Sequence, residues 1–423
     1  MDRVIFHSDC NSFYSSVELL SRPELRDVPV AVCGDPESRH GIILAKNEPA
    51  KRFGVQTAET IVSAKRKCPG LVLLPSHHDL YREYSKRVNA IYARYTEFVE
   101  PFGIDESWLD VTASWHLFGS SPGAVAQQLR RAVKAETGLT VSVGVSFNKV
   151  FAKLGSDYKK PDAVTQFTRE NYKRVVWALP VTSLLYVGRS AAKTLAGLGI
   201  RTIGELAAAD PSVLRAALGK LGGELSRYAR GEDDSPVRSI YDKPEVKSVG
   251  NGLTFPHDLT DIDEARSALF ALADEVASRL RAHGMWASSV QLSVKDPQMK
   301  LITRQAPLPS PVCTGRELAQ AALALLAANW RFPAPVRALT VTALNLSHSA
   351  PEQLTLFDEG ASSRSDKHER LEKSLDAIRG KYGHAAIAGA SVLNRGLGLG
   401  KLSIDDPRKK REPNTFNNKD KER

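Results

Sequence analysis

The stretch Ile104-Asp105-Glu106-Ser107-Trp108-Leu109-Asp110-Val111-Thr112 places two adjacent acids between apolar segments. Residues 99–104 and 107–112 both have the composition of strands, so the pattern predicts a hairpin with Asp105 and Glu106 at its turn. A further short β-prone segment, residues 3–8, ends at another acid, Asp9. The fold therefore depends on whether these strands belong to one sheet.

The segments around these strands predict a sheet covered by helices. Apolar residues recur at helical spacing from residue 79 to 95 and again at Val125, Leu129 and Val133, and residues 140–145 predict a further strand. The order of strand, helix, two strands, helix and strand is that of a split βαβ, ferredoxin-like arrangement, with a small α/β insert after the first strand. In this arrangement Asp9 and the Asp105–Glu106 pair lie on adjacent strands.

The rest of the chain divides into further regions. Beyond about residue 165, short helices are separated by glycines, and segments 186–188 and 197–200 are typical of turns in helix-hairpin-helix units, which present backbone N–H groups to phosphates. Residues 230–236 predict a linker, and residues 247–347 a separate α/β domain. Residues 367–381 predict a helix, and the charged residues after Lys401 predict disorder.

Composition narrows the class of protein. The chain has 423 residues, a net charge of +10 and four widely separated cysteines without a CxxC pair. This length predicts roughly two to four domains, and the cysteine pattern favours neither disulfides nor a structural zinc site. We expect no membrane span and no secretory signal, hence a cytoplasmic location. The positive charge favours a polyanionic partner.

Asp9, Asp105 and Glu106 form the strongest candidate site. Three carboxylates at neighbouring strand ends can hold two divalent cations, and hard oxygen ligands favour Mg²⁺. One ion would activate an attacking hydroxyl, while the other would bind a triphosphate and stabilise leaving pyrophosphate. Acids in β-turns are common, however, and for a lone Asp-Glu pair we would favour the interpretation that it binds nothing.

Other polar and aromatic residues are weaker candidates. Lys51, Arg52 and Lys160 are able to contact phosphoryl oxygens, although most lysines lie on a solvated surface. Tyr14 could stack on a sugar, but core packing is the commoner role of such a residue. The glycine-rich segment 396–401 has the wrong spacing for a phosphate loop and is interpreted as flexible tail, and His77-His78 is interpreted as part of a turn.

Three stretches together resemble the Y-family translesion DNA polymerases, in the bacterial DNA polymerase IV (DinB-like) branch. They are residues 8–18, residues 104–112, and residues 143–154 with Asp157 and Lys160-Pro161. The resemblance runs from residue 3 to about 347 and continues into Gln353-Leu354-Thr355-Leu356-Phe357. Several independent motifs in the same order make coincidence improbable.

The resemblance implies a mixed α/β (α+β) right-hand polymerase. Its expected parts are a ferredoxin-like palm (1–11 and 76–165), small fingers (12–75), a helix-hairpin-helix thumb (166–238), a separate α/β little finger (239–348) and a clamp-binding linker with a mostly flexible tail (349–423). The palm residues are in turn expected to hold two Mg²⁺ ions.

The resemblance also implies roles for individual residues. The metal ligands would be Asp9, Asp105, Glu106 and the backbone carbonyl of Cys10, with Glu106 also the catalytic acid. Tyr14 falls on the steric-gate position that selects dNTP over rNTP, Phe13 lies beside it at the nucleotide, and Lys51 and Lys160 match triphosphate-binding positions.

Some residues depart from the pattern of the family. Asn11 replaces the second Asp of the usual Asp-x-Asp, Glu48 stands where many members have Tyr, and Lys51 stands where they have Arg. The change to lysine turns a bidentate contact into a point charge, which leaves triphosphate affinity open. In the first thumb hairpin, Leu185-Tyr186 replaces Pro-Gly, which would weaken that phosphate contact.

Residues 353–357 match the QLxLF form of the bacterial sliding-clamp motif. Leu354, Leu356 and Phe357 can anchor in an apolar groove while Gln353 supplies hydrogen bonds. The expected partners are therefore primer–template DNA, dNTPs and the sliding clamp, with no membrane, and we expect a monomer.

The leading hypothesis is a template-directed, low-fidelity DNA polymerase of DNA damage tolerance that adds dNTPs to a primer 3′-OH by two-metal nucleotidyl transfer. A second hypothesis is a non-catalytic DNA- and clamp-binding accessory protein on the same fold, which the intact carboxylates disfavour. A third is another palm-based enzyme such as a nucleotide cyclase, which the hairpin-rich region and the clamp peptide disfavour.

Overall fold

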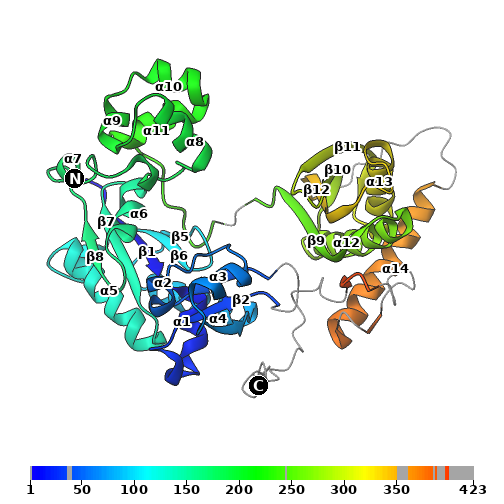
Figure 1. The fold of residues 1–423 in the computed structure, drawn as a ribbon, viewed down its shortest axis with the longest axis horizontal. Helices are drawn as coiled ribbons and strands as arrows, with labels where there is room; N and C mark the ends of the chain where they lie inside the picture. Colours follow the sequence, from blue (N-terminus) through cyan, green and yellow to red (C-terminus); the bar gives the residue numbers. More distant parts are fainter. Residues whose placement is uncertain are drawn as a thin grey trace. The chain divides into compact units, whose positions relative to one another are not determined.

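The computed structural model describes residues 2–35, 41–242, 245–349, 361–383, 386–387 and 396–399, and for residues 361–366 the backbone only. The described chain divides into two compact units, one up to Asp242 and the other from Glu245 (Figure 1). In these ranges no helix is both long and apolar enough to cross a membrane.

A five-stranded sheet with the order β5-β6-β1-β7-β8 forms the centre of the first unit. Its strands are β1 (Ile5–Cys10), β5 (Val99–Pro101), β6 (Glu106–Asp110), β7 (Val141–Ser146) and β8 (Val164–Gln166). Strand β1 pairs antiparallel with both β6 and β7, so the predicted adjacency of the acidic strand ends is confirmed. The sequence analysis missed β8, which has only three residues and pairs parallel with β7.

Helices cover both faces of this sheet. Phe6 packs in one core with α4 (His78–Tyr92) and α5 (Pro122–Thr137), whereas Ile5 packs on the opposite face with Ala152 of α6 (Lys149–Tyr158). A short 3₁₀ helix, Trp115–Leu117, precedes α5. Because side chains alternate along a strand, the odd-numbered residues of β1, including Asp9, share the face that α6 covers.

The insert after β1 is a second, three-stranded sheet with the order β3-β2-β4. Its strands are β2 (Val30–Cys33), β3 (Ile43–Lys46) and β4 (Val72–Pro75), and its helices are α1 (Phe13–Leu20), a 3₁₀ helix (Pro23–Leu25), α2 (Glu48–Arg52) and α3 (Ile61–Lys67). The sequence analysis missed α3, since Ile61 and Ala64 are its only buried residues and give too short an apolar period.

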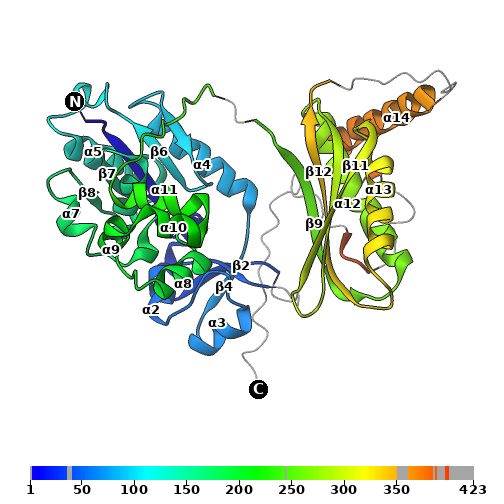
Figure 2. The same cartoon turned by 90° about the horizontal axis from the view of Figure 1, so that it is seen from above.

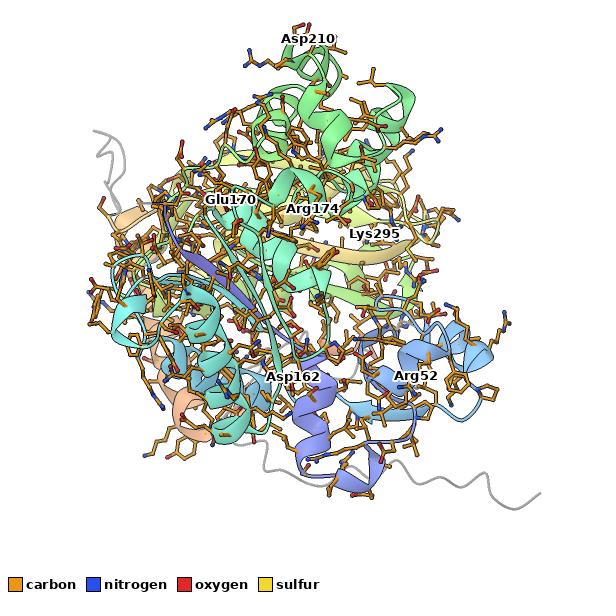
Figure 3. All side chains as sticks on the ribbon, turned by 90° about the vertical axis from the view of Figure 1, so that its left-hand side faces the viewer. Arg52, Asp162, Glu170, Arg174, Asp210 and Lys295 are labelled. Carbon is orange, nitrogen blue, oxygen red and sulfur yellow. The ribbon has the colours of Figure 1, made fainter. Side chains whose placement is uncertain are left out.

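Short helices complete the first unit, as the glycine spacing predicted. They are α7 (Tyr172–Val175), the 3₁₀ helix Val181–Ser183, α8 (Arg189–Gly197), α9 (Ile203–Ala208), α10 (Pro211–Leu218) and α11 (Lys220–Ala229). Thr202 and Glu205 form a capping box at the start of α9, and the Asp210 side chain, labelled in Figure 3, caps α10.

The predicted linker after α11 has no helix or strand, but it is anchored to the first sheet. Val237 is 4% exposed in a cluster with Ile5 and Trp108, and the Asp233 carboxylate accepts a hydrogen bond from the backbone N–H of Lys149. The linker therefore packs against the first unit and belongs to it.

The second unit is a four-stranded antiparallel sheet with the order β11-β10-β12-β9. Its strands are β9 (Ser248–Leu259), β10 (Trp286–Lys295), β11 (Leu301–Val312) and β12 (Val336–Ser347), and its helices are α12 (Ile262–Ala282), α13 (Gly315–Asn329) and α14 (Ala361–Tyr382). Figure 2 shows α12 and α13 against one face of the sheet, where they enclose the core of the unit.

The C-terminal region differs from the sequence expectation. The helix predicted at 367–381 is present as α14, and it docks on α12 through ion pairs of Arg281 with Glu372 and Asp376. Leu397 and Leu399 are 2% and 8% exposed in the core of the unit, so the interpretation of the glycine-rich segment as flexible tail was wrong for residues 396–399. Residues 353–357 and those after 400 lie outside the described residues.

Candidate active site

The end of β1 and the start of β6 bring two of the predicted metal ligands together. Asp9 is the direct register partner of Glu106 across the two antiparallel strands. Side chains at such positions lie on the same face of the sheet with Cβ atoms roughly 4.5–5.5 Å apart, so the two carboxylates are neighbours. The sheet register therefore fixes their spacing.

The turn before β6 adds Asp105. The backbone N–H of Cys10 donates to the Asp105 carbonyl at 2.9 Å, and the N–H of Phe102 donates to the Glu106 carbonyl at 3.0 Å. A Cβ at Gly103 would lie 3.4 Å from Glu106 Cγ and 3.5 Å from Asp105 Oδ1, so the turn folds closely over both side chains. These contacts bring the predicted trio to one edge of the sheet.

The electrostatics of the trio favour a cation. Burial, followed by the charges of Asp9 and Glu106, raises the pKa of Asp105 to about 6. Burial also raises the pKa of Asp9, although Lys160 opposes that effect. Carboxylates that are desolvated and repel one another gain stability from a divalent ion, and all are hard oxygen donors. The residues present fit Mg²⁺ chemistry.

Lysines nevertheless contact two of the three carboxylates. Lys153 Nζ lies 2.5 Å from Glu106 Oε2, and Lys160 Nζ lies 2.9 Å from Asp9 Oδ1. Asp157 contacts both ammonium groups, Lys160 at 2.9 Å and Lys153 at 3.7 Å. In the part of the chain that the structure describes, no three His, Cys, Asp or Glu side chains form a ready-made metal site.

Two glycines position Lys153 over the sheet. A Cβ at Gly144 on β7 would lie 1.9 Å from the Ala152 carbonyl oxygen, and one at Gly155 would lie 3.0 Å from the Cα of Gly144. Only residues without a side chain allow α6 to approach β7 this closely. The close approach brings Lys153 within reach of Glu106.

His7 lies beside Glu106 in the interior. Its Nδ1 is 2.7 Å from Ser156 Oγ, and its Nε2 is 3.4 Å from Glu106 Oε2. Burial, followed by the charges of Lys153 and Lys160, holds the pKa of His7 well below its ordinary value, so its imidazole is neutral. The sequence analysis missed His7, Ser156 and Lys153 as site residues; the alternation of His7 with Asp9 on one strand was the available signal.

The two predicted aromatic residues lie in different surroundings. The Tyr14 ring is partly buried and stacks on Tyr81 with 4.1 Å between ring centroids and 11° between planes. Phe13 is 3% exposed within the core, and its ring contacts that of Tyr14. Burial, followed by the charge of Asp105, raises the pKa of Tyr14.

The predicted phosphate ligands are partly exposed. Lys51 Nζ pairs with Glu48 Oε1 at 2.5 Å, and about two fifths of each side chain is exposed. Glu48, noted above as a departure from the family, therefore neutralises the lysine expected to bind triphosphate. Arg52, labelled in Figure 3, follows Lys51 at the end of α2 and is exposed.

The other departures have structural roles. The Asn11 side chain donates to Ser142 Oγ at 2.9 Å and accepts from the backbone N–H of Asp162 at 2.8 Å. Asp162, labelled in Figure 3, lies in the loop that follows Lys160, so Asn11 anchors that loop to the sheet. Tyr186 adopts a left-handed backbone conformation, φ 71°, that glycine usually occupies, so the hairpin turn is retained with some strain.

Comparisons with known proteins agree with this geometry. Residues 8–157 match the impB/mucB/samB family, and residues 246–356 match the C-terminal domain of the same family. The fold is similar to that of a solved Y-family DNA polymerase chimera, with a TM-score of 0.73 and 21% sequence identity. The similarity covers 82% of this chain and 100% of the chimera. The fold is therefore the right-hand fold of the Y-family polymerases.

The similar curated sequences are more specific. A DNA polymerase IV of Acetivibrio thermocellus is 46% identical over 399 residues, covering 94% of this chain and 99% of the relative. DNA polymerase IV 1 of Bacillus subtilis is 36% identical over 397 residues, which cover 93% of this chain and 94% of the relative. The chain belongs to the impB/mucB/samB family, among the DNA polymerase IV sequences.

Proposed function

We propose that this chain is a translesion DNA-directed DNA polymerase that adds dNTPs to a primer 3′-OH. The observation that carries the proposal is the convergence of Asp9, Asp105 and Glu106 at one sheet edge, in a chain of DNA polymerase IV sequence. Two Mg²⁺ ions at this edge would activate the hydroxyl and stabilise the leaving pyrophosphate.

The residues of this chain have separate tasks in that reaction. Asp9, Asp105, Glu106 and the Cys10 carbonyl hold the metal ions, while Lys160 and Lys51 bind the triphosphate. The neutral His7, oriented by its contact with Ser156, lies beside Glu106 on the sheet face that α6 covers. The division into palm, fingers, thumb and little finger at the boundaries given above is part of the same proposal.

The second unit offers a surface for the DNA backbone. The sheet face opposite α12 and α13 carries a shallow cavity of about 340 Å³ whose lining includes Gly252, Ser293, Lys295 and Thr340. Small and hydroxyl side chains with a lysine are able to contact phosphates without reading bases. A polymerase that tolerates damaged templates requires sequence-independent contacts of this kind.

The remaining parts of the proposal come from the sequence. Gln353, Leu354, Leu356 and Phe357 would bind a sliding clamp, and a Phe357→Ala change is expected to abolish that binding without affecting primer extension on a short template. We propose a monomer that acts in the cytoplasm, where its four buried free cysteines stay reduced.

Discrimination between sugars tests the proposed nucleotide site. The wild type is expected to incorporate dNTPs and to reject rNTPs, because the Tyr14 ring occupies the space of a 2′-OH. Tyr14→Ala should admit rNTPs while keeping dNTP incorporation. Tyr84→Ala, a change at a tyrosine on α4 that is not proposed to contact the nucleotide, is the control. If sugar discrimination is the same in Tyr14→Ala and wild type, the role given to Tyr14 is wrong.

A further inference from the structure

Two lysines beside the proposed active site, Lys153 and Lys160, pair with its carboxylates. Lys153 pairs with Glu106, Lys160 with Asp9, and both with Asp157. The pairs form one chain of alternating charge that runs from Asp9 to Glu106. The two proposed metal ligands at its ends are therefore neutralised by the protein itself.

These pairs are compatible with the absence of a preformed metal site in the described ranges. An ammonium group that contacts a carboxylate oxygen takes a position that a metal ion requires. Lys160 Nζ lies 2.9 Å from Asp9 Oδ1 and 2.9 Å from Asp157 Oδ1, so it bridges the two carboxylates.

We propose that Lys153 and Lys160 are built-in counter-ions of the free enzyme, and that divalent ions enter the site by displacing their ammonium groups onto Asp157. This inference rests on the proposed function, because it takes Asp9 and Glu106 as metal ligands. Asp157 thereby acts as a positioning residue that keeps both lysines beside the site.

The geometry makes this displacement a short movement. Lys153 and Asp157 lie one turn apart on α6, and Lys160 lies just beyond the end of this helix, where its ammonium group still reaches Asp157. Half of the Asp157 side chain is exposed, and it already contacts both ammonium groups. Lysine is a flexible point charge, so it is able to rotate from one carboxylate to another without a change in the backbone.

The inference also orders the events in the site. Without metal, the lysines suppress repulsion between Asp9 and Glu106. When metal ions take these carboxylates, Lys160 becomes available for the triphosphate that arrives with them. One side chain would thus serve the free enzyme and the nucleotide complex in turn.

Metal affinity in the absence of DNA and nucleotide tests the inference. Mn²⁺ is titrated into the full chain, and free Mn²⁺ is followed by its electron paramagnetic resonance signal. Lys153→Met and Lys160→Met are each expected to bind Mn²⁺ roughly three- to tenfold more tightly than wild type, because no ion pair has to be broken. Lys153→Arg keeps the pair and should show no gain.

Lys159→Met is the matched control. Lys159 is an exposed neighbour of Lys160 with the same charge, so this change alters the long-range field without removing either pair. Thermal unfolding checks that every variant folds. Equal Mn²⁺ affinity in wild type, Lys153→Met and Lys160→Met, or an equal gain in Lys159→Met, would overturn the inference.

Asp9→Asn separates this inference from the proposed function. Loss of Mn²⁺ binding in Asp9→Asn is expected and locates the bound ion at the proposed site. If wild type and Asp9→Asn bind Mn²⁺ alike, both the proposed site and the inference are wrong. If only the lysine variants fail to differ from wild type, the proposed site stands and the inference falls.

Discussion

Two ion-pair networks in this chain use different cations. In the first unit Lys153 and Lys160 contact the carboxylates of the proposed active site, and their side chains are 16% and 32% exposed. In the second unit Arg281 and Arg379 fix α14 to α12, and their side chains are 5% and 9% exposed. In the first network, metal ions are proposed to replace the lysine ammonium groups. The second network holds two helices together permanently.

The geometry of the arginine network explains its permanence. Arg281 Nε and Nη2 donate to both oxygens of Asp376 at 2.6 and 3.0 Å, and Glu372 accepts from Arg281 and from the backbone N–H of Gly315. A planar fork held by two carboxylates cannot be displaced one bond at a time. A lysine ammonium group has no planar fork, so its contact with one carboxylate can be lost while its contact with Asp157 remains. Arginine is therefore suited to holding α14 on α12, whereas lysine is suited to a site where a metal ion replaces it.

The largest expected effect comes from Asp9→Asn, which removes a metal ligand and the partner of Lys160. We expect single-nucleotide incorporation to fall by ~10³-fold or more, since one metal position is lost. Rapid-quench kinetics with saturating DNA would measure it. Asp2→Asn, in an exposed pair with Arg169, is the control and should be as active as wild type. Incorporation within tenfold of wild type would contradict the assignment.

Arg281→Met is expected to have the next largest effect, on stability. It leaves Glu372 and Asp376 without their cation in a mostly buried contact, which costs about 3 kcal/mol in the free energy of unfolding of the second unit. Urea denaturation followed by circular dichroism measures this loss. Arg266→Met, in an exposed pair on the same helix, should lose less than about 0.5 kcal/mol. Equal losses would remove the distinction between the networks.

The pH dependence of metal binding is expected to report on Asp105. Its pKa is raised to about 6, so as the pH falls below that value the carboxyl binds a proton that competes with the metal. Mn²⁺ affinity should weaken by up to about tenfold per pH unit below 6. The stability of the metal-free protein should change with pH in the opposite direction. The native state holds this proton more tightly than the unfolded chain, so the free energy of unfolding falls as the pH rises from about 4 to 6.

Asp105→Asn provides the comparison for this titration. The variant cannot take up that proton, so its weaker Mn²⁺ binding should vary less between pH 5 and 7 than that of wild type. Identical slopes in the two proteins would show that a different group governs metal binding in this range.

The smallest expected effect is at the triphosphate. Glu48→Gln removes the partner of Lys51, and the freed ammonium group should lower the KM for dNTP about two- to threefold at constant kcat. Steady-state incorporation measures both constants. Glu136→Gln, in an exposed pair with Arg94, is the control. A raised KM in Glu48→Gln would mean that Glu48 helps to bind the nucleotide.

The sequence predicted the parts of the site that lie on regular strands. The alternation in β1 and the two acids at the start of β6 were sufficient for the adjacency of Asp9 and Glu106. The short elements α3 and β8 were missed because each has too few apolar residues to define a period.

The contacts around the carboxylates could not be predicted in the same way. Lys153 reaches Glu106 only because Gly144 and Gly155 let α6 approach β7, a distance that no local pattern specifies. The burial of Leu397 and Leu399 likewise depends on a core formed by residues far earlier in the chain, from Val249 to Ala343. Tertiary packing, not local sequence, determines both.

Primer extension by purified protein tests the central claim most directly. Wild type and Glu106→Ala are compared with Mg²⁺ and four dNTPs on an undamaged template and on one with a minor-groove adduct, with DNA binding measured in parallel. The account predicts extension of both templates by wild type only, with nearly equal DNA binding by the two proteins. Extension by Glu106→Ala, or no extension by a wild type that still binds DNA, would contradict it.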